Sequence, residues 1–133
     1  MVAHRIPYVA TASIAYPEML IRKVQKALSI KGTKFMHIYS PCPTGWKMDP
    51  GLTVKIAKEA ISCRAFSLYE VENGVWTVTM KPKKTPLKDY LYRQGRFRHM
   101  PDDLIEQVEK DLDARWEELL FKEQCSAGKS GED

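Results

Sequence analysis

Apolar residues along the first forty positions follow the pattern of a strand, a helix and a second strand. Residues 8–14 are rich in small and β-branched side chains, which is typical of a buried strand. A helix is predicted to begin at Pro17 and to stop at Gly32. Helical spacing separates a core face from a solvent face, namely Leu20, Ile21, Val24, Ala27 and Leu28 against Arg22, Lys23, Gln25 and Lys26. The apolar run at 34–40 predicts a central strand of a parallel sheet, covered on both faces.

The middle of the chain predicts a loop, a second helix and a hairpin. The loop PCPTGW occupies residues 41–46, and Asp49 with Pro50 then supplies an N-cap and a first-turn proline. The apolar side of this helix comprises Val54, Ala57 and Ile61. Two strand-like runs, 66–72 and 75–80, flank Asn73-Gly74, and both of these turn residues tolerate a positive φ, so a β-hairpin is expected.

The last third of the chain is divided by charge. Residues 81–99 carry about +6, and residues 101–123 carry about −6. Apolar positions in the acidic stretch predict an amphipathic helix with the core residues Leu104, Ile105, Val108, Leu112, Trp116 and Leu119. Residues 124–133 are expected to be disordered. We therefore divide the chain into an α/β part (1–80), a helical arm (81–123) and a tail (124–133).

Composition narrows the class of protein. The chain has 133 residues, of which 44% are hydrophobic, and a net charge of +4, which fits one globular domain. Its apolar runs fall short of the roughly 18–20 residues that a membrane helix needs. The N-terminus does not have the pattern of a secretory signal, so we expect a cytoplasmic protein. Two strands from βα units, one hairpin and an arm make an incomplete sheet, and the chain looks like the C-terminal part of something larger.

Cys42 is the residue most suited to chemistry. It follows a predicted parallel strand, at the edge of the sheet where ligands bind in open α/β folds, and prolines flank it on both sides. It could be an inert side chain in a turn, a nucleophile or a metal ligand. An iron–sulfur cluster needs four thiolates, and this chain has three cysteines. If Cys42 holds a cluster, other ligands must therefore come from elsewhere.

Other candidate residues have a simpler explanation. Cys63 and Cys125 are expected to be incidental, and the three histidines lack the spacing of a zinc site. Basic and aromatic residues alternate between 88 and 98, as on a nucleic-acid surface. Because an acidic helix follows directly, packing of this stretch against that helix or against a partner subunit is the favoured interpretation.

Four segments carry a family resemblance: YVATASIAYPEMLIRKVQKA, HIYSPCPTGW, LYEVENG and YLYRQGRFRHM. In this order, from about residue 6 to 120, they resemble the C-terminal part of the β subunit of pyruvate:ferredoxin oxidoreductase, a 2-oxoacid:ferredoxin oxidoreductase. The resemblance implies the C-terminal portion of a thiamine-diphosphate-binding, Rossmann-like α/β fold with a β-hairpin and a C-terminal helical arm.

The resemblance also implies a role for Cys42, which matches the family's fourth cysteine ligand of a [4Fe–4S] cluster. Thr44, Gly45 and Trp46 would shape the pocket around it. The other three cysteines and the motif for thiamine diphosphate and Mg²⁺ lie upstream in the family and are absent from this sequence. The implied reaction converts pyruvate, coenzyme A and oxidised ferredoxin to acetyl-CoA, CO₂ and reduced ferredoxin.

The implied partners are the other oxidoreductase subunits, the missing N-terminal part of the β subunit and, through the complex, ferredoxin. Neither a membrane nor a nucleic acid is an expected partner, and the chain alone is expected to be inactive. Two alternatives compete with this interpretation: a non-catalytic interaction module or orphan fragment, and a basic nucleic-acid-binding module that uses residues 81–99.

Overall fold

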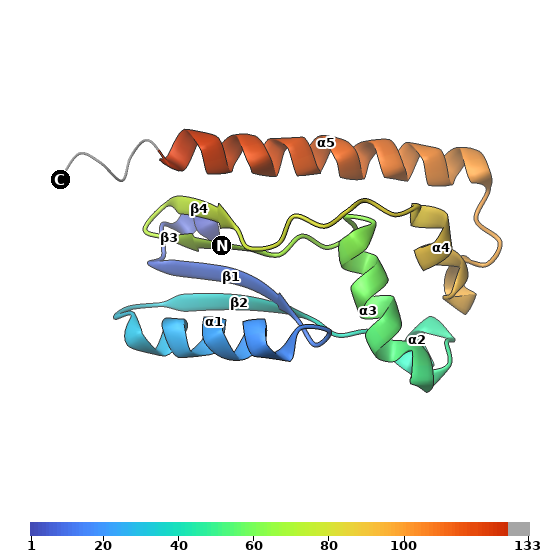
Figure 1. Ribbon diagram of the computed structural model, residues 1–133, viewed down its shortest axis with the longest axis horizontal. Helices are drawn as coiled ribbons and strands as arrows, with labels where there is room; N and C mark the ends of the chain where they lie inside the picture. The colour runs from blue at the N-terminus through green and yellow to red at the C-terminus, as the bar shows by residue number, and fades with distance from the viewer. Residues whose placement is uncertain (128–133) are drawn as a thin grey trace.

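The computed structural model describes residues 1–127, which form a mixed four-stranded sheet and five α-helices (Figure 1). In chain order the elements are η1 (Val2–His4), β1 (Tyr8–Ser13), α1 (Pro17–Ser29), β2 (Lys34–Tyr39), α2 (Pro43–Trp46), η2 (Pro50–Leu52), α3 (Thr53–Ser62), β3 (Tyr69–Glu72), β4 (Val75–Val78), α4 (Leu87–Tyr92), η3 (Gly95–Phe97) and α5 (Asp102–Ala127). The strand order is β2-β1-β3-β4. The predicted α/β class, with a hairpin and a C-terminal helix, is confirmed.

The parallel pair and the hairpin both belong to this sheet. β1 pairs with β2 in parallel and with β3 in antiparallel orientation. β3 and β4 form the predicted hairpin, in which Asn73 and Gly74 have φ of 48° and 86°. These are the left-handed conformations that a two-residue hairpin turn requires. The hairpin prediction is confirmed, although its first strand begins at Tyr69, three residues later than expected.

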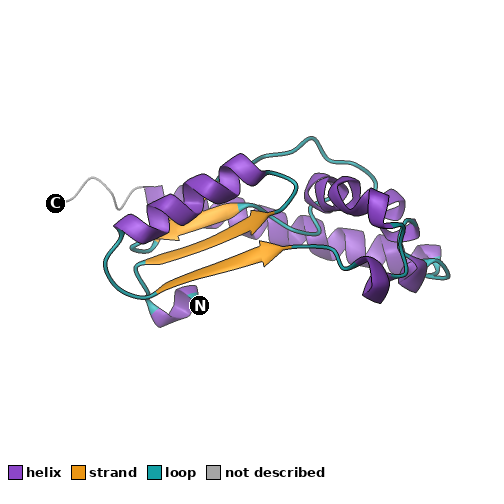
Figure 2. Cartoon of the chain, turned by 90° about the horizontal axis from the view of Figure 1, so that it is seen from below, coloured by secondary structure: helices purple, strands orange, loops and turns teal. Residues whose placement is uncertain are grey.

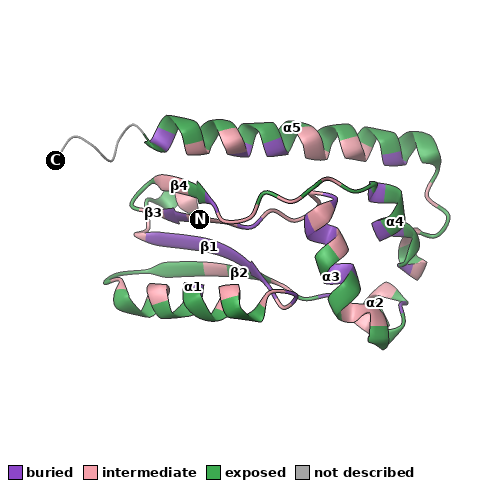
Figure 3. Ribbon diagram, viewed as in Figure 1, coloured by how far each residue is buried: buried purple, intermediate pink, exposed green. Residues whose placement is uncertain are grey.

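The prediction that 34–40 forms a central strand is wrong for this chain. β1 is the strand buried along its whole length, whereas β2 is an edge strand with mostly exposed residues (Figure 3). Phe35 and Ile38 are among the exposed large apolar side chains. The physical reason is that, within residues 1–127, no strand pairs with the outer edge of β2.

The predicted faces of α1 also need correction. α1 lies across one face of the sheet (Figure 2) and ends at Ser29, before Gly32. Lys23, expected on the solvent face, is 3% exposed, whereas three residues of the expected core face are exposed: Ile21, Val24 and Leu28. In this orientation the Lys23 ammonium group donates hydrogen bonds to carbonyl oxygens of β1 and β3 and to the Thr79 hydroxyl, and these contacts satisfy the buried charge.

A helical half adjoins the sheet. The Asp49 carboxylate accepts a hydrogen bond from the Gly51 N–H and so caps η2, while α3 begins at Thr53. Ala57 and Ile61 of α3 are buried as predicted, but Val54 is exposed. One apolar cluster joins α3, α4 and the start of α5, and a second joins the hairpin to the later part of α5.

α5 is longer than the sequence predicts. Residues 124–127 of the expected disordered tail continue this helix, because the Ser126 hydroxyl accepts a hydrogen bond from the Trp76 N–H of β4. The rest of the expected tail, 128–133, lies outside the described residues. Within residues 1–127, no helix is both long and apolar enough to cross a membrane. The division of the chain at residue 80 stays a prediction.

Candidate functional site

Cys42 lies in a short segment that we call the cysteine loop (residues 41–48), directly after the end of β2. Where the sequence predicts only a loop, this segment contains the single-turn helix α2, and Cys42 is its N-cap. Its thiol is exposed. Its backbone carbonyl accepts a hydrogen bond from the Trp46 N–H at 2.9 Å, and its sulfur accepts one from the Gly45 N–H at 3.4 Å. The loop therefore holds one accessible thiol and aims a backbone donor at its sulfur. Such donors stabilise a thiolate or a metal-bound sulfur.

A second segment, far away in sequence, fixes the cysteine loop. The Gly95 N–H donates to the carbonyl oxygen of Lys47 at 3.1 Å. A Cβ at position 95 would lie only 2.7 Å from that oxygen, so this approach requires glycine. Gln94 is fully buried, and its side-chain amide donates to the Tyr90 carbonyl. The segment QGRF thus packs directly behind the loop PCPTGW.

Aromatic and cationic groups complete the contact between these two segments. The Arg96 guanidinium lies 4.0 Å from the centre of the Trp46 ring and donates through Nε to the Gln94 side-chain oxygen. Behind Trp46, the hydroxyl groups of Tyr39 and Tyr90 are 2.6 Å apart. Burial and this hydrogen bond raise the pKa of Tyr39. Two of the four segments that carry the family resemblance, HIYSPCPTGW and YLYRQGRFRHM, therefore meet in one structural unit.

The structure does not bring the other sequence candidates to Cys42. Cys63 is buried in the helical core, where desolvation raises the pKa of its thiol to about 11, and Cys125 is exposed near the end of α5. The His37 ring packs edge-on against Phe66. Among the described residues, no group of three or more His, Cys, Asp or Glu side chains could hold a metal ion. Thr44 and Gly45 are exposed beside Cys42, and Trp46 is half-buried.

The donor set around Cys42 fits one ligand position of a cluster. It offers a single thiol with a backbone N–H directed at the sulfur, on a loop held by a neighbouring segment. An iron–sulfur cluster tolerates such hydrogen bonds, and they tune its potential. The remaining ligands would have to come from another polypeptide segment.

Several basic residues of the stretch 81–99 form salt bridges with acidic side chains. Three of its lysines pair with α5, through Lys81–Glu123, Lys84–Asp113 and Lys88–Asp102. Arg93 pairs with Glu59 of α3. The favoured interpretation, packing against the acidic helix, is confirmed for the three lysines, whereas Arg93 pairs with α3 instead.

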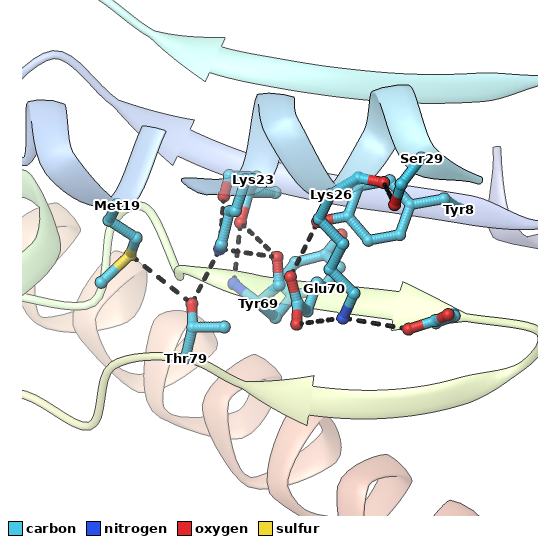
Figure 4. Close-up of polar contacts among 10 residues, drawn as sticks. Tyr8, Met19, Lys23, Lys26, Ser29, Tyr69, Glu70 and Thr79 are labelled. Carbon is cyan, nitrogen blue, oxygen red and sulfur yellow. Dashed lines mark hydrogen bonds and ion pairs between the residues drawn. The ribbon is translucent and has the colours of Figure 1, made fainter. Parts of the chain in front are cut away.

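Sequence reasoning missed a polar network between α1 and the sheet (Figure 4). Lys23 Nζ donates to the carbonyl oxygens of Thr11 and Tyr69 and to the Thr79 hydroxyl, at 2.8, 3.2 and 2.8 Å. Desolvation lowers the pKa of Lys23 to about 8. Lys26 forms ion pairs with Glu70 and Glu72. The sequence contains one indication of this network, because Lys23 and Lys26 are three residues apart and therefore lie on the same face of the helix.

Gln94 was also missed as a buried residue. Its neighbours Tyr92, Arg93 and Arg96 are exposed, so the sequence shows no hydrophobic periodicity that would predict its burial. Its fully buried amide supports the chain just before Gly95. The only available signal was its place in the QGRFRH motif.

Comparison with known proteins identifies relatives of this chain. PorB of pyruvate synthase from Methanocaldococcus jannaschii is 49% identical over 116 residues, which cover 86% of this chain and 39% of that protein. VorB of ketoisovalerate oxidoreductase from Pyrococcus furiosus is 45% identical over 122 residues, 90% of this chain and 39% of that protein. PorB from Thermotoga maritima is 39% identical over 133 residues, 96% of this chain and 41% of that protein.

No family model matches the chain. The chain spans about two fifths of the length of the curated relatives it matches. The relatives are subunits of oxidoreductase enzymes, and they bear out the resemblance of the four sequence segments. The chain belongs to the β subunits of the 2-oxoacid:ferredoxin oxidoreductase family, of which it corresponds to a C-terminal part.

Proposed function

We propose that this chain acts in the cytoplasm as the C-terminal part of a pyruvate:ferredoxin oxidoreductase β subunit, in which Cys42 supplies one thiolate ligand of a [4Fe–4S] cluster. The observation that carries the proposal is the hydrogen bond from the Gly45 N–H to the Cys42 sulfur, on an exposed loop that follows a parallel strand. The names of the relatives support the subunit, and the loop chemistry supports the ligand.

Several residues of the cysteine loop and of the segment behind it then have a defined role. Cys42 would hold iron through its thiolate, and the Gly45 N–H would stabilise the charge on that sulfur. Trp46, covered by the Arg96 guanidinium, shields one side of the loop from water. Gly95 holds the end of the loop through its hydrogen bond to Lys47. Together they keep the thiolate in a constant orientation.

The cofactors supply the chemistry that side chains lack. When bound, thiamine diphosphate with Mg²⁺ provides the electron sink for decarboxylation of a 2-oxo acid, and iron–sulfur clusters carry the electrons to ferredoxin. We propose pyruvate as the 2-oxo acid. Because the described residues offer no complete ligand set, we also propose that the chain is inactive until it joins the rest of the β subunit and the other subunits.

Iron analysis of the assembled complex tests the ligand assignment. The chain is expressed with an affinity tag in its native source and purified under anaerobic conditions together with its partners. We expect Cys42→Ser to lower the iron content by about four atoms per β subunit, or to convert the electron paramagnetic resonance signal of one cluster to that of a three-iron species. The complex itself should still assemble.

Cys125→Ser is the matched control, because Cys125 is also exposed but lies on α5. It should leave iron content and spectra unchanged. If Cys42→Ser retains the full iron content and an unaltered spectrum, Cys42 is not a ligand. If the purified wild-type complex contains no iron and no thiamine, the enzymatic assignment fails as a whole.

A further inference from the structure

The Arg96 side chain is exposed, yet its neighbours hold it in a fixed orientation. Its guanidinium group contacts two aromatic rings, 4.0 Å from the centre of the Trp46 ring and 4.6 Å from that of Phe97. Its Nε–H donates to the side-chain oxygen of Gln94 at 3.0 Å, and Gln94 is fully buried. A side chain that is ordered in advance loses less entropy when a ligand binds to it.

The terminal nitrogens of Arg96 have no acceptor among the described residues. A guanidinium group donates hydrogen bonds from Nε and from both terminal nitrogens, and within residues 1–127 Arg96 uses Nε alone. Two terminal nitrogens in this planar arrangement bind two oxygen atoms of a carboxylate or a phosphate at once. Arg96 therefore has the geometry of an oxyanion-binding residue.

The positive charge of Arg96 is not balanced by an acidic side chain. The ion pairs of the basic stretch 81–99 involve other residues, namely Lys81, Lys84, Lys88 and Arg93. Arg96 forms no salt bridge within residues 1–127, and neither does Arg98, which is exposed directly after η3. The unbalanced charge of this stretch is therefore concentrated around Arg96.

A third cation comes from the cysteine loop. Lys47 is exposed and also has no salt bridge to a described residue. It is next to Arg96 in space, because its carbonyl oxygen accepts the hydrogen bond from the Gly95 N–H. The carboxylate closest to it in sequence, that of Asp49, caps η2 instead. We call Lys47, Arg96 and Arg98 together the Arg96 surface.

The charge of the Arg96 surface favours a phosphate over a carboxylate. A carboxylate carries one negative charge, which one cation balances, whereas a phosphate monoester carries about −1.5 to −2 near pH 7 and has three acceptor oxygens. We propose that the Arg96 surface binds a phosphate group of a small molecule. Two phosphate oxygens accept hydrogen bonds from the terminal nitrogens of Arg96, and Lys47 and Arg98 attract the remaining charge.

The source of this phosphate group follows from the proposed reaction. Two phosphorylated molecules take part in it, coenzyme A and thiamine diphosphate, and the choice between them rests on the proposed function. The phosphate site itself rests only on residues of this chain and requires no iron.

A nuclear magnetic resonance titration of the full 133-residue chain with inorganic phosphate tests the site. At constant ionic strength, phosphate should shift the Nε–H resonance of Arg96 and the indole N–H resonance of Trp46, which the guanidinium contacts. Arg96→Met should weaken phosphate binding at least tenfold. Arg96→Lys keeps the charge but lacks the pair of terminal nitrogens, so it should weaken binding at least threefold. Acetate should bind at least threefold more weakly than phosphate.

Arg22→Met is the matched control. Arg22 is also an exposed arginine with no salt bridge to a described residue, but it lies on α1, which covers the sheet, whereas Arg96 lies in the helical half (Figure 1). This variant should bind phosphate like the wild type, and circular dichroism should show that all three variants fold. The proposal is overturned if phosphate leaves the Arg96 and Trp46 resonances unchanged, if Arg96→Met binds like the wild type, or if Arg22→Met weakens binding equally. Acetate that binds as tightly as phosphate would make this a carboxylate site and would also overturn it.

Competition with inorganic phosphate identifies the source. Coenzyme A or thiamine diphosphate should displace phosphate from the wild-type chain, and Arg96→Met should weaken the binding of that molecule at least tenfold. If neither molecule competes, or if a single-stranded oligonucleotide binds more tightly than both, the proposal of a small-molecule phosphate is overturned.

This proposal and the ligand assignment can fail separately. Phosphate binding that depends on Arg96, together with full iron content in Cys42→Ser, would refute the ligand and leave the phosphate site intact. Loss of a cluster in Cys42→Ser, together with phosphate binding that is insensitive to Arg96→Met, would refute the phosphate site alone.

Discussion

Replacing Lys23 by methionine tests how α1 is attached to the sheet. Lys23 is 3% exposed and its ammonium group has three acceptors, two of them backbone carbonyls. Desolvation lowers its pKa from 10.5 to about 8. Nearby Glu70 raises this pKa and Lys26 lowers it, but both effects are smaller than that of burial.

The lowered pKa fixes the sign and the size of a pH effect on stability. Below pH 8 both the folded and the unfolded chain carry the charge, and folding is opposed by about 3 kcal/mol, at about 1.4 kcal/mol per pKa unit. As the pH rises from 8 toward 10.5, the folded chain loses this proton first, so the penalty falls. Between pH 7 and pH 9.5, Lys23 should therefore add about 2 kcal/mol to the free energy of unfolding.

Urea denaturation at the two pH values measures this contribution. The free energy of unfolding of the wild type should rise by about 2 kcal/mol relative to that of Lys23→Met between pH 7 and pH 9.5. Comparing the two proteins cancels the titration of other groups, such as the Cys63 thiol. Lys26→Met is the matched control on the same helix: the pKa of Lys26 is raised, so its contribution should change little below pH 9.5. Parallel pH profiles for the wild type and Lys23→Met would refute the reasoning.

Two further predictions concern the cysteine loop and the thiols. Gly95→Ala should displace the loop, because the new Cβ would meet the Lys47 carbonyl oxygen at 2.7 Å; a change in the alkylation rate of Cys42 would be the evidence, and an unchanged rate would contradict it. At pH 8, iodoacetamide should label Cys42 and Cys125 quickly and Cys63 only after unfolding, since Cys63 is 1% exposed and its thiol pKa is about 11. Mass spectrometry of the labelled peptides counts the modified thiols, and rapid labelling of Cys63 in the folded chain would contradict its burial.

Elements with strong local signals could be predicted from the sequence. The Asn73-Gly74 turn needs two positive φ angles that few other residue pairs accept, so the hairpin follows from chemistry within a few residues. The α5 pattern persists over many turns. Of its predicted core positions, Ile105, Trp116 and Leu119 are buried, Val108 and Leu112 are half-buried, and Leu104 is exposed. The position of Cys42 directly after a parallel strand was also predicted correctly, whereas its role as a ligand stays a prediction.

The wrong predictions concern residues whose burial depends on contacts between segments that are far apart in the sequence. Lys23 has the sequence signature of a solvent-exposed residue, and its burial depends on the carbonyl groups of β1 and β3 and on the Thr79 hydroxyl, which are distant in sequence. Apolar residues on α1 and β2 predicted burial in a core, but several of them are exposed among residues 1–127. The support of the cysteine loop by Gly95 joins positions almost fifty residues apart, and no periodicity signals such a contact.

The length of α5 has a consequence for folding cooperativity. Its 26 residues extend for about 39 Å at 1.5 Å per residue. Ile105 near its start packs into the apolar cluster of the helical half, whereas Trp116 and Leu119 pack against the hairpin. One continuous helix thus links two separate cores, so neither can unfold without weakening the other. A glycine pair in the exposed middle of α5 should therefore split one denaturation transition into two.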